Sequence, residues 1–279
     1  MDRRRSGPLT AGLLLLAARG HAALEGTDPA PRLVRLAGSH PALPAGAQDF
    51  RGNPATAAAG TERWEAGGGI TRPLGLEGLW EQAAWAMWNP APVAPIGAGI
   101  RMGWREFRAD DIYRDDALFA SGAVRWRDLS IGAASSLLRC DYGDGDEGFA
   151  SGVSVGGLAR RQDLSFGFEA TDPSLFLADP PWMREPWSAA LGAALAPKGR
   201  SWRTAATAAY RQEAGWSWRL AQEAILPLGV DAGLGVGLEP FRLAGGIGWR
   251  LGPVRLDAAA EGDPVLGWQS HLSFSLLIR

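Results

Sequence analysis

Apolar and polar residues alternate along most of the chain from residue 96 onward, which is the pattern of a β-strand with one apolar and one polar face. Residues 215–225 show the alternation most clearly. Trp218 shares its face with the apolar residues at alternate positions, and Arg219 and Glu223 share the opposite face. The segments between the alternating stretches contain Gly, Asp and Pro, and no long amphipathic helix is predicted.

The pattern predicts an all-β protein, and specifically an antiparallel, up-and-down transmembrane β-barrel of about twelve strands, within a range of roughly ten to fourteen. The strands are expected over the following ranges: 96–107, 112–126, 128–140, 148–159, 162–170, 187–196, 201–212, 215–225, 229–237, 241–249, 252–260 and 265–278.

Strand length and loop length favour a membrane barrel over a soluble fold. Many of the expected strands run to ten residues or more, as a tilted transmembrane strand requires. Long connections at 141–147 and 171–186 alternate with tight ones near residues 127 and 160, as outer loops alternate with inner turns in outer-membrane barrels. Alternation by itself also fits a soluble periplasmic β-sandwich that binds carbohydrate through its tryptophans, so this fold is the alternative.

The tryptophans fall near the two ends of the expected strands. Indole rings favour the membrane–water interface, because the ring is apolar while its N–H seeks a hydrogen-bond partner. We therefore expect two interfacial girdles, formed by Trp104, Trp126, Trp187, Trp202, Trp216, Trp218, Trp249 and Trp268.

The polar faces of the same strands would line the interior. Buried charges are tolerated only when they are paired or hydrated, so a barrel of this width needs either water or a plug in its lumen. The lumen-lining residues are expected to be Arg101, Arg105, Arg203, Arg211, Arg219, Glu223, Arg242, Arg255 and Asp257.

The chain before residue 96 does not show the alternation of apolar and polar residues. Residues 1–22 resemble a cleaved signal peptide, with three arginines, a short apolar run and a small-x-small site, which predicts export to the outer membrane. Residues 23–95 lack periodicity and are expected to form a plug beneath or within a barrel made of residues 96–279. Within the plug, 67–76 is expected as a short strand and 79–88 as a short helix.

Asn53-Pro54-Ala55 resembles an element near the start of FadL-like outer-membrane proteins, a group that includes long-chain fatty-acid transporters and PorV-like secretion components. The resemblance implies a barrel plugged by an N-terminal hatch, with Asn53, Pro54 and Ala55 in the hatch. Barrels of that group typically have fourteen strands. The resemblance also implies passive transport of an apolar small molecule, or a scaffold for a surface or secretion complex.

The composition limits which partners, cofactors and metals are expected. The charge is nearly balanced at −2 and no block of like charges appears, so nucleic acid is not an expected partner, whereas the lipid bilayer is. A single cysteine, Cys140, excludes an internal disulfide, and neither a cofactor nor a metal is expected. The acidic stretch Asp141–Glu147 leaves calcium open, because its spacing departs from that of the known calcium loops.

One short motif suggests catalysis. His271-Leu272-Ser273 resembles the His-x-Ser of outer-membrane phospholipases, in which histidine activates serine, but in a strand positions i and i+2 always share a face. We therefore expect a protein that is not an enzyme, with an outer-membrane lipase as an alternative.

Overall fold

The computed structural model describes residues 31–38, 41–43, 46–73, 77–90, 94–110, 112–142, 146–263 and 267–278. The expected signal peptide, residues 1–22, lies outside these ranges. None of the helices within them is long and apolar enough to cross a membrane.

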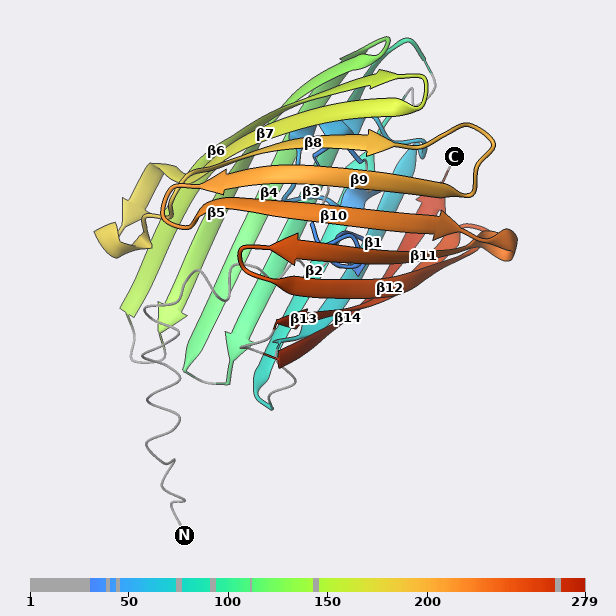
Figure 1. Cartoon of the computed structure of the whole chain (residues 1–279). Coiled ribbons are helices and arrows are strands. Elements are labelled where there is room, and N and C mark those ends of the chain that lie inside the picture. Colours follow the sequence, from blue (N-terminus) through green and yellow to red (C-terminus); the bar gives the residue numbers. More distant parts are fainter. Residues whose placement is uncertain are drawn as a thin grey trace.

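Fourteen antiparallel strands form a closed barrel in which each strand pairs with the next along the chain and the first, β1, pairs with the last, β14 (Figure 1). The strands are β1 (Trp64–Arg72), β2 (Leu79–Trp88), β3 (Ile96–Ala109), β4 (Tyr113–Trp126), β5 (Leu129–Tyr142), β6 (Asp146–Arg161), β7 (Leu164–Asp179), β8 (Ser188–Leu195), β9 (Trp202–Arg211), β10 (Gly215–Ile225), β11 (Val230–Leu238), β12 (Arg242–Leu251), β13 (Val254–Asp263) and β14 (Gly267–Ile278).

The barrel confirms the expected architecture and corrects the strand number. The twelve strands expected from residue 96 onward correspond in order to β3–β14, so the error lies in the two additional strands β1 and β2. Both come from residues 23–95, which were expected to form the plug, and the barrel wall therefore begins at Trp64 rather than at residue 96. Adding two strands leaves the assignment of long and short connections to the two ends of the barrel unchanged.

The segment 79–88 is a strand and not the expected helix. Its inward face carries Trp85 and Met87, which pack against Phe50, and its outward face carries Trp80 and Trp88. Because both faces are apolar and three alanines are present, neither a period of two nor one of 3.6 stands out in the sequence. Pairing with β1 and β3 along the whole segment decides the conformation.

The hairpin of β6 and β7 is longer than the pattern predicted. Residues 171–179, expected to belong to a loop, continue β7 past a register shift between Ser151 and Val153. The chain then forms the short helix η4 (Pro181–Met183) before β8. Met183 is buried, whereas Leu175 and Phe176 are exposed, so this apolar stretch is divided between interior and surface.

Side chains alternate between the interior and the outer wall along most of the strands. In β11, for example, Leu234 is 72% exposed while Gly233 and Gly235 face the interior. Exposed Ile, Leu, Val, Phe or Trp side chains occupy outward positions in every strand except β2 and β9, where the outward positions carry mainly alanines and half-buried Trp or Tyr. An apolar outer wall on a closed barrel is the arrangement of a lipid-facing protein, and the β-sandwich alternative is wrong.

The described residues that precede β1 lie inside the wall (Figure 1). We call the described residues of this stretch, 31–38, 41–43 and 46–63, the N-terminal segment; it contains the short helices α3 (Pro31–Val34), η1 (Gly46–Gln48) and η2 (Pro54–Ala58). Helix α3 contacts β12–β14, η1 contacts β1–β3, and η2 contacts β3–β6. The segment therefore touches opposite sides of the barrel and packs against the inward side chains of the wall.

Candidate functional site

The candidate site is the filled interior of the barrel. All nine side chains expected to line the lumen lie on inward positions of their strands: Arg101, Arg105, Arg203, Arg211, Arg219, Glu223, Arg242, Arg255 and Asp257. Several of them bind the N-terminal segment directly. We call the end of the barrel where Trp64 pairs with Ile278 the termini end, and the opposite end the far end.

Asn53 joins the N-terminal segment to the wall. Its side-chain nitrogen donates to the carbonyl of Pro41 at 2.7 Å and to that of Gly157 in β6 at 3.0 Å. Its side-chain oxygen accepts from the N–H of Ala55 at 3.0 Å and so caps η2, where Pro54 occupies the first turn. Asn53, Pro54 and Ala55, the residues of the resemblance, are all fully enclosed.

Arg101 of β3 binds the same turn from the opposite direction. Its guanidinium donates to the hydroxyl of Thr56 at 3.0 Å and to the carbonyl of Asn53 at 3.3 Å. It lies 3.6 Å from a carboxylate oxygen of Asp49, so its charge is compensated within the segment. Because Arg101 is only 1% exposed, these contacts take place in a medium where an unsatisfied guanidinium would be very costly.

Glycines on the wall give the segment room to approach. A Cβ atom on Gly167 of β7 would lie 1.7 Å from the carbonyl oxygen of Pro41, and one on Gly99 of β3 would lie 2.2 Å from that of Ala57. Backbone atoms cannot move aside as a flexible side chain can, so no other residue fits at these two positions. The wall is therefore shaped to the segment.

We expect Gly167→Val to displace residues 41–43 from the wall, because its side chain would overlap the Pro41 carbonyl. Ala42, now 1% exposed, should then become accessible. The measurement is labelling of Ala42→Cys by a bulky maleimide in a Cys140→Ser background. Gly122→Val is the control, since nothing lies within 4 Å of a Cβ there. Equal labelling of both variants would contradict the tight fit.

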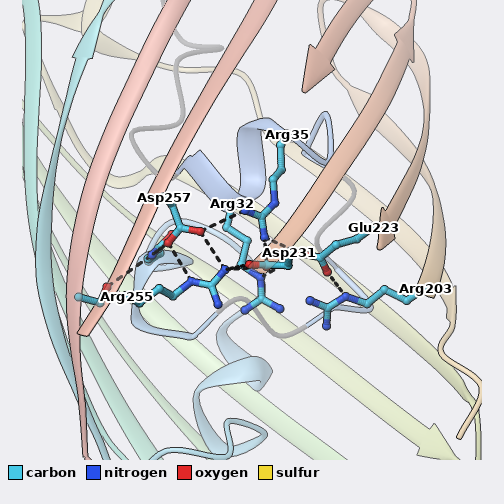
Figure 2. Close-up of polar contacts among 9 residues, drawn as sticks. Arg32, Arg35, Arg203, Glu223, Asp231, Arg255 and Asp257 are labelled. Carbon is cyan, nitrogen blue, oxygen red and sulfur yellow. Dashed lines mark hydrogen bonds and ion pairs between the residues drawn. The ribbon is translucent and has the colours of Figure 1, made fainter. Parts of the chain in front are cut away.

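A second set of contacts joins the start of the segment to β9–β13. Arg35 is fully buried and donates to Glu223 at 2.5 Å, to Asp257 at 3.1 Å and to Asp231 (Figure 2). We call the seven residues that meet here the ionic cluster: Arg32, Arg35, Arg203, Glu223, Asp231, Arg255 and Asp257.

The ionic cluster is shared between the segment and the wall. Arg255 donates to Asp231 at 2.7 Å and to Asp257 at 2.8 Å, and Arg203 pairs with Glu223. Burial, together with repulsion from Arg203, lowers the pKa of Arg32 to about 10, so Arg32 remains charged at neutral pH. Within the cluster the wall supplies all the acids and the segment supplies two of the bases.

The far end of the interior has a different character. Cys140, Ala150 and Met183 are buried against Tyr113 and Tyr142. The Tyr113 ring lies 5.1 Å from that of Tyr142 and 6.1 Å from that of Phe107. We call this set the aromatic cluster: Phe107, Tyr113, Tyr142, Cys140 and Met183.

Polar groups of the wall lie between the aromatic cluster and the segment. Arg105 donates to Asp115 at 2.5 Å and lies 3.8 Å from Glu81, so this expected lumen-lining arginine is paired across three strands. Arg242 likewise pairs with Glu261 at 3.3 Å. The interior is thus lined by neutralised charges at this level.

His271 does not form the serine–histidine pair that its motif suggested. Its Nδ1 lies 2.9 Å from the hydroxyl of Thr71, and among the described residues it makes no hydrogen bond to Ser273. Both side chains are buried inside the barrel. The geometry therefore does not assemble a hydrolase site here, and the expectation that the protein is not an enzyme stays a prediction.

The eight tryptophans expected at the membrane interface all point outward. Trp126, Trp202 and Trp249 lie toward the termini end, and the others lie toward the far end: Trp104, Trp187, Trp216, Trp218 and Trp268. Near the far end a row of outward rings joins β8 to β10, with Tyr210 at 5.3 Å from Trp187 and 5.4 Å from Trp216. Their role at a membrane interface stays a prediction.

One cavity among the described residues is an outer groove. It has a volume of about 720 Å³ and is lined mainly by outward residues such as Phe166, Phe168, Leu191 and Trp218. Its floor carries the small side chains Ala193, Ala206 and Ala208. The groove therefore faces the surroundings of the barrel and not the interior.

The sequence did not indicate the ion pairs of several interior residues. Arg35 stands in a stretch without periodicity, and Asp231 occupies an alternating strand but was not singled out as an ion-pair partner. The acidic stretch Asp141–Glu147 lies partly outside the described residues, and within them no group of acidic, histidine or cysteine side chains is arranged to hold a metal ion.

Comparisons with known proteins support the fold. No family model matches the chain, and no curated protein matches it. Among solved structures, the CymD monoaromatic hydrocarbon channel is 12% identical with a TM-score of 0.63, covering 92% of this chain and 98% of that one. A deltaS2 mutant of the TodX monoaromatic hydrocarbon channel is 12% identical with a TM-score of 0.61, covering 91% and 98%.

The outer membrane protein Omp33 of Acinetobacter baumannii is similar over a smaller share. It is 7% identical with a TM-score of 0.53, covering 78% of this chain and 98% of that one. At these identities the similarity shows the fold alone, which is that of outer-membrane β-barrel channels.

Proposed function

We propose that the protein is an outer-membrane channel for a small apolar molecule, and that the N-terminal segment is the plug that closes it. The observation that carries the proposal is the enclosure of the N-terminal segment within a closed barrel whose outer wall is apolar. An apolar wall suits lipid, and a segment fixed at Asn53, Arg101 and Arg35 obstructs the lumen.

The solute class follows from the aromatic cluster. Phe107, Tyr113, Tyr142 and Met183 offer an apolar, polarizable surface at the far end, suited to a flat aromatic ring. The similar CymD and TodX structures are of monoaromatic hydrocarbon channels, which favours the same class of solute here. Passage beyond the cluster requires the plug to shift.

The proposal is tested by uptake of radiolabelled toluene into bacterial cells that carry the protein in the outer membrane. We expect severalfold faster initial uptake than in cells without it. Met183→Arg should remove the gain, because it places a charge in the apolar entrance, whereas Leu175→Arg should not, since Leu175 is 54% exposed nearby.

Uptake that is equal with and without a correctly folded barrel would exclude the channel. Folding is checked by the difference in gel mobility between boiled and unboiled samples. A scaffold for a surface or secretion complex would then be the better proposal. The observation that favours it is the exposed apolar stretch Leu175–Leu177 at the far end of β7.

A further inference from the structure

Within the described ranges, one cation at the termini end of the interior has no acidic partner. Arg160 lies on an inward position near the end of β6 and is partly exposed. Its guanidinium donates to the carbonyl of Ala59 at 3.1 Å, just after η2. Among the described residues, no carboxylate lies within ion-pair distance of Arg160. The adjacent Arg161 is exposed on the outward face of the same strand.

The charged neighbours that act most strongly on Arg160 are themselves arginines. Arg125 of β4 and Arg203 of β9 both repel it. Arg125 donates to the carbonyl of Ala94 at 2.7 Å, and Arg203 pairs with Glu223. We call Arg125, Arg160 and Arg203 the basic arc.

The ionic cluster shares Arg203 with the basic arc. Its carboxylates do not supply a negative charge for Arg160. Glu223 is already shared by Arg32, Arg35 and Arg203. Glu65 lies close enough to attract Arg32 and Arg255, and counting it still leaves the bases in excess. Among the described residues, and with Arg125 left aside, five arginines then face four carboxylates: Arg32, Arg35, Arg160, Arg203 and Arg255 against Glu65, Glu223, Asp231 and Asp257.

An uncompensated guanidinium is unfavourable in a partly enclosed site, and more so beside like charges. A guanidinium offers five N–H donors in a planar fork that matches the two oxygens of a carboxylate or phosphate group. Arg160 uses one nitrogen in its bond to Ala59, and its partial exposure leaves the group within reach of solutes.

We propose that the basic arc is a binding site for a small oxyanion, a carboxylate or phosphate group, at the termini end of the barrel. Arg160 binds the anion, and Arg125 and Arg203 supply the positive field around it. The N-terminal segment lies between this site and the aromatic cluster. Anion binding therefore does not depend on which apolar solute enters at the far end.

Isothermal titration of the purified, detergent-solubilised full chain tests the site, with sodium benzoate and sodium phosphate as separate probes in a chloride buffer. We expect saturable binding of at least one probe. Arg160→Gln should weaken it by about tenfold or more, because the charged bidentate contact is lost. Arg161→Gln should leave the Kd unchanged, since its side chain faces outward one position away.

The two probes distinguish the source of the oxyanion. Binding of benzoate alone identifies the carboxylate of an organic solute, and binding of phosphate identifies a phosphate group. The site is refuted if neither probe binds to the wild-type chain, if Arg160→Gln binds like wild type, or if Arg161→Gln weakens binding equally. If Arg160→Gln does not fold, Arg160→Lys is used in its place, because lysine keeps the positive charge but lacks the planar guanidinium that donates two parallel hydrogen bonds.

This titration involves no transport. Failure of anion binding would leave toluene uptake as evidence for the channel, and failure of uptake would leave the anion site standing.

Discussion

Replacing residues 41–59 with a Gly-Ser linker should convert the barrel into an open pore. The replaced stretch contains η1, η2, Asn53 and the carbonyls that Arg101 binds, so the linker would remove most of the N-terminal segment from the lumen and leave α3 in place. Single-channel conductance in planar bilayers should rise by about an order of magnitude, since a barrel of this width encloses water once it is emptied. A linker of about ten residues can reach roughly 30 Å.

The design spares both α3 and β1. Deleting as far as residue 66 would remove the start of β1 at Trp64 and damage the wall itself, so the replacement stops at Ala59. A sample that shifts on boiling but conducts like wild type would show that the segment does not close the pore. Gly122→Val, which meets no neighbour, serves as the conductance control.

The second large effect is expected at Arg35, where Arg35→Met should destabilise the protein by about 3–5 kcal/mol. The substitution removes the base that is shared by Glu223, Asp231 and Asp257, and all three carboxylates are nearly or fully buried. Arg32, Arg203 and Arg255 remain, but Arg35 alone contacts all three carboxylates, and Arg32 reaches only Glu223, at 3.9 Å. The measurement is the urea concentration at which the unboiled form of the protein is lost.

Arg139→Met is the matched control for this prediction. Arg139 forms an ion pair of 2.6 Å with Glu147, but both side chains are more than two-fifths exposed, so water solvates the charges that are left behind. We expect its urea midpoint to stay near that of wild type. Equal midpoints for the two variants would show that burial of the ionic cluster does not matter to stability.

The strands from residue 96 onward could be predicted from the sequence because each exposes apolar side chains on one face only. Trp216, Trp218 and Leu220, for example, all point outward, and Arg219 and Glu223 point inward. Lipid on one side and a polar interior on the other impose this alternation. Expected and observed strand ends accordingly agree within a few residues, except at β7.

The expected short strand at 67–76 overlaps β1, but neither β1 nor β2 could be assigned to the barrel wall from the sequence, because the alternation fails there. In β1 the run Gly67–Gly69 has no side chains to alternate, and in β2 the inward Trp85 is as apolar as the outward Trp88. Both inward faces pack on the N-terminal segment instead of facing a polar lumen. Packing against the N-terminal segment therefore explains why the inward faces of β1 and β2 lack the polar residues that would produce an alternating pattern.

The candidate site was predictable in its residues but not in its contacts. Alternation marks Arg203, Glu223 and Arg255 as inward, yet nothing in the sequence shows that Arg35 meets Glu223, 188 residues away. Such pairings depend on strand register and on closure of the barrel. The position of Asn53 in the interior agrees with the resemblance to FadL-like proteins, but its bond to Gly157 required the fold.

The pairing of β1 with β14 also constrains how the molecule assembles. Thr71 and His271, which meet at that seam, are 200 residues apart, so the seam is the most distant contact between neighbouring strands. The N-terminal segment runs directly into β1, and the wall carries glycine recesses that match it. The strands can therefore assemble around the segment as a template, and pairing of β1 with β14 then closes the barrel with the segment already in its interior.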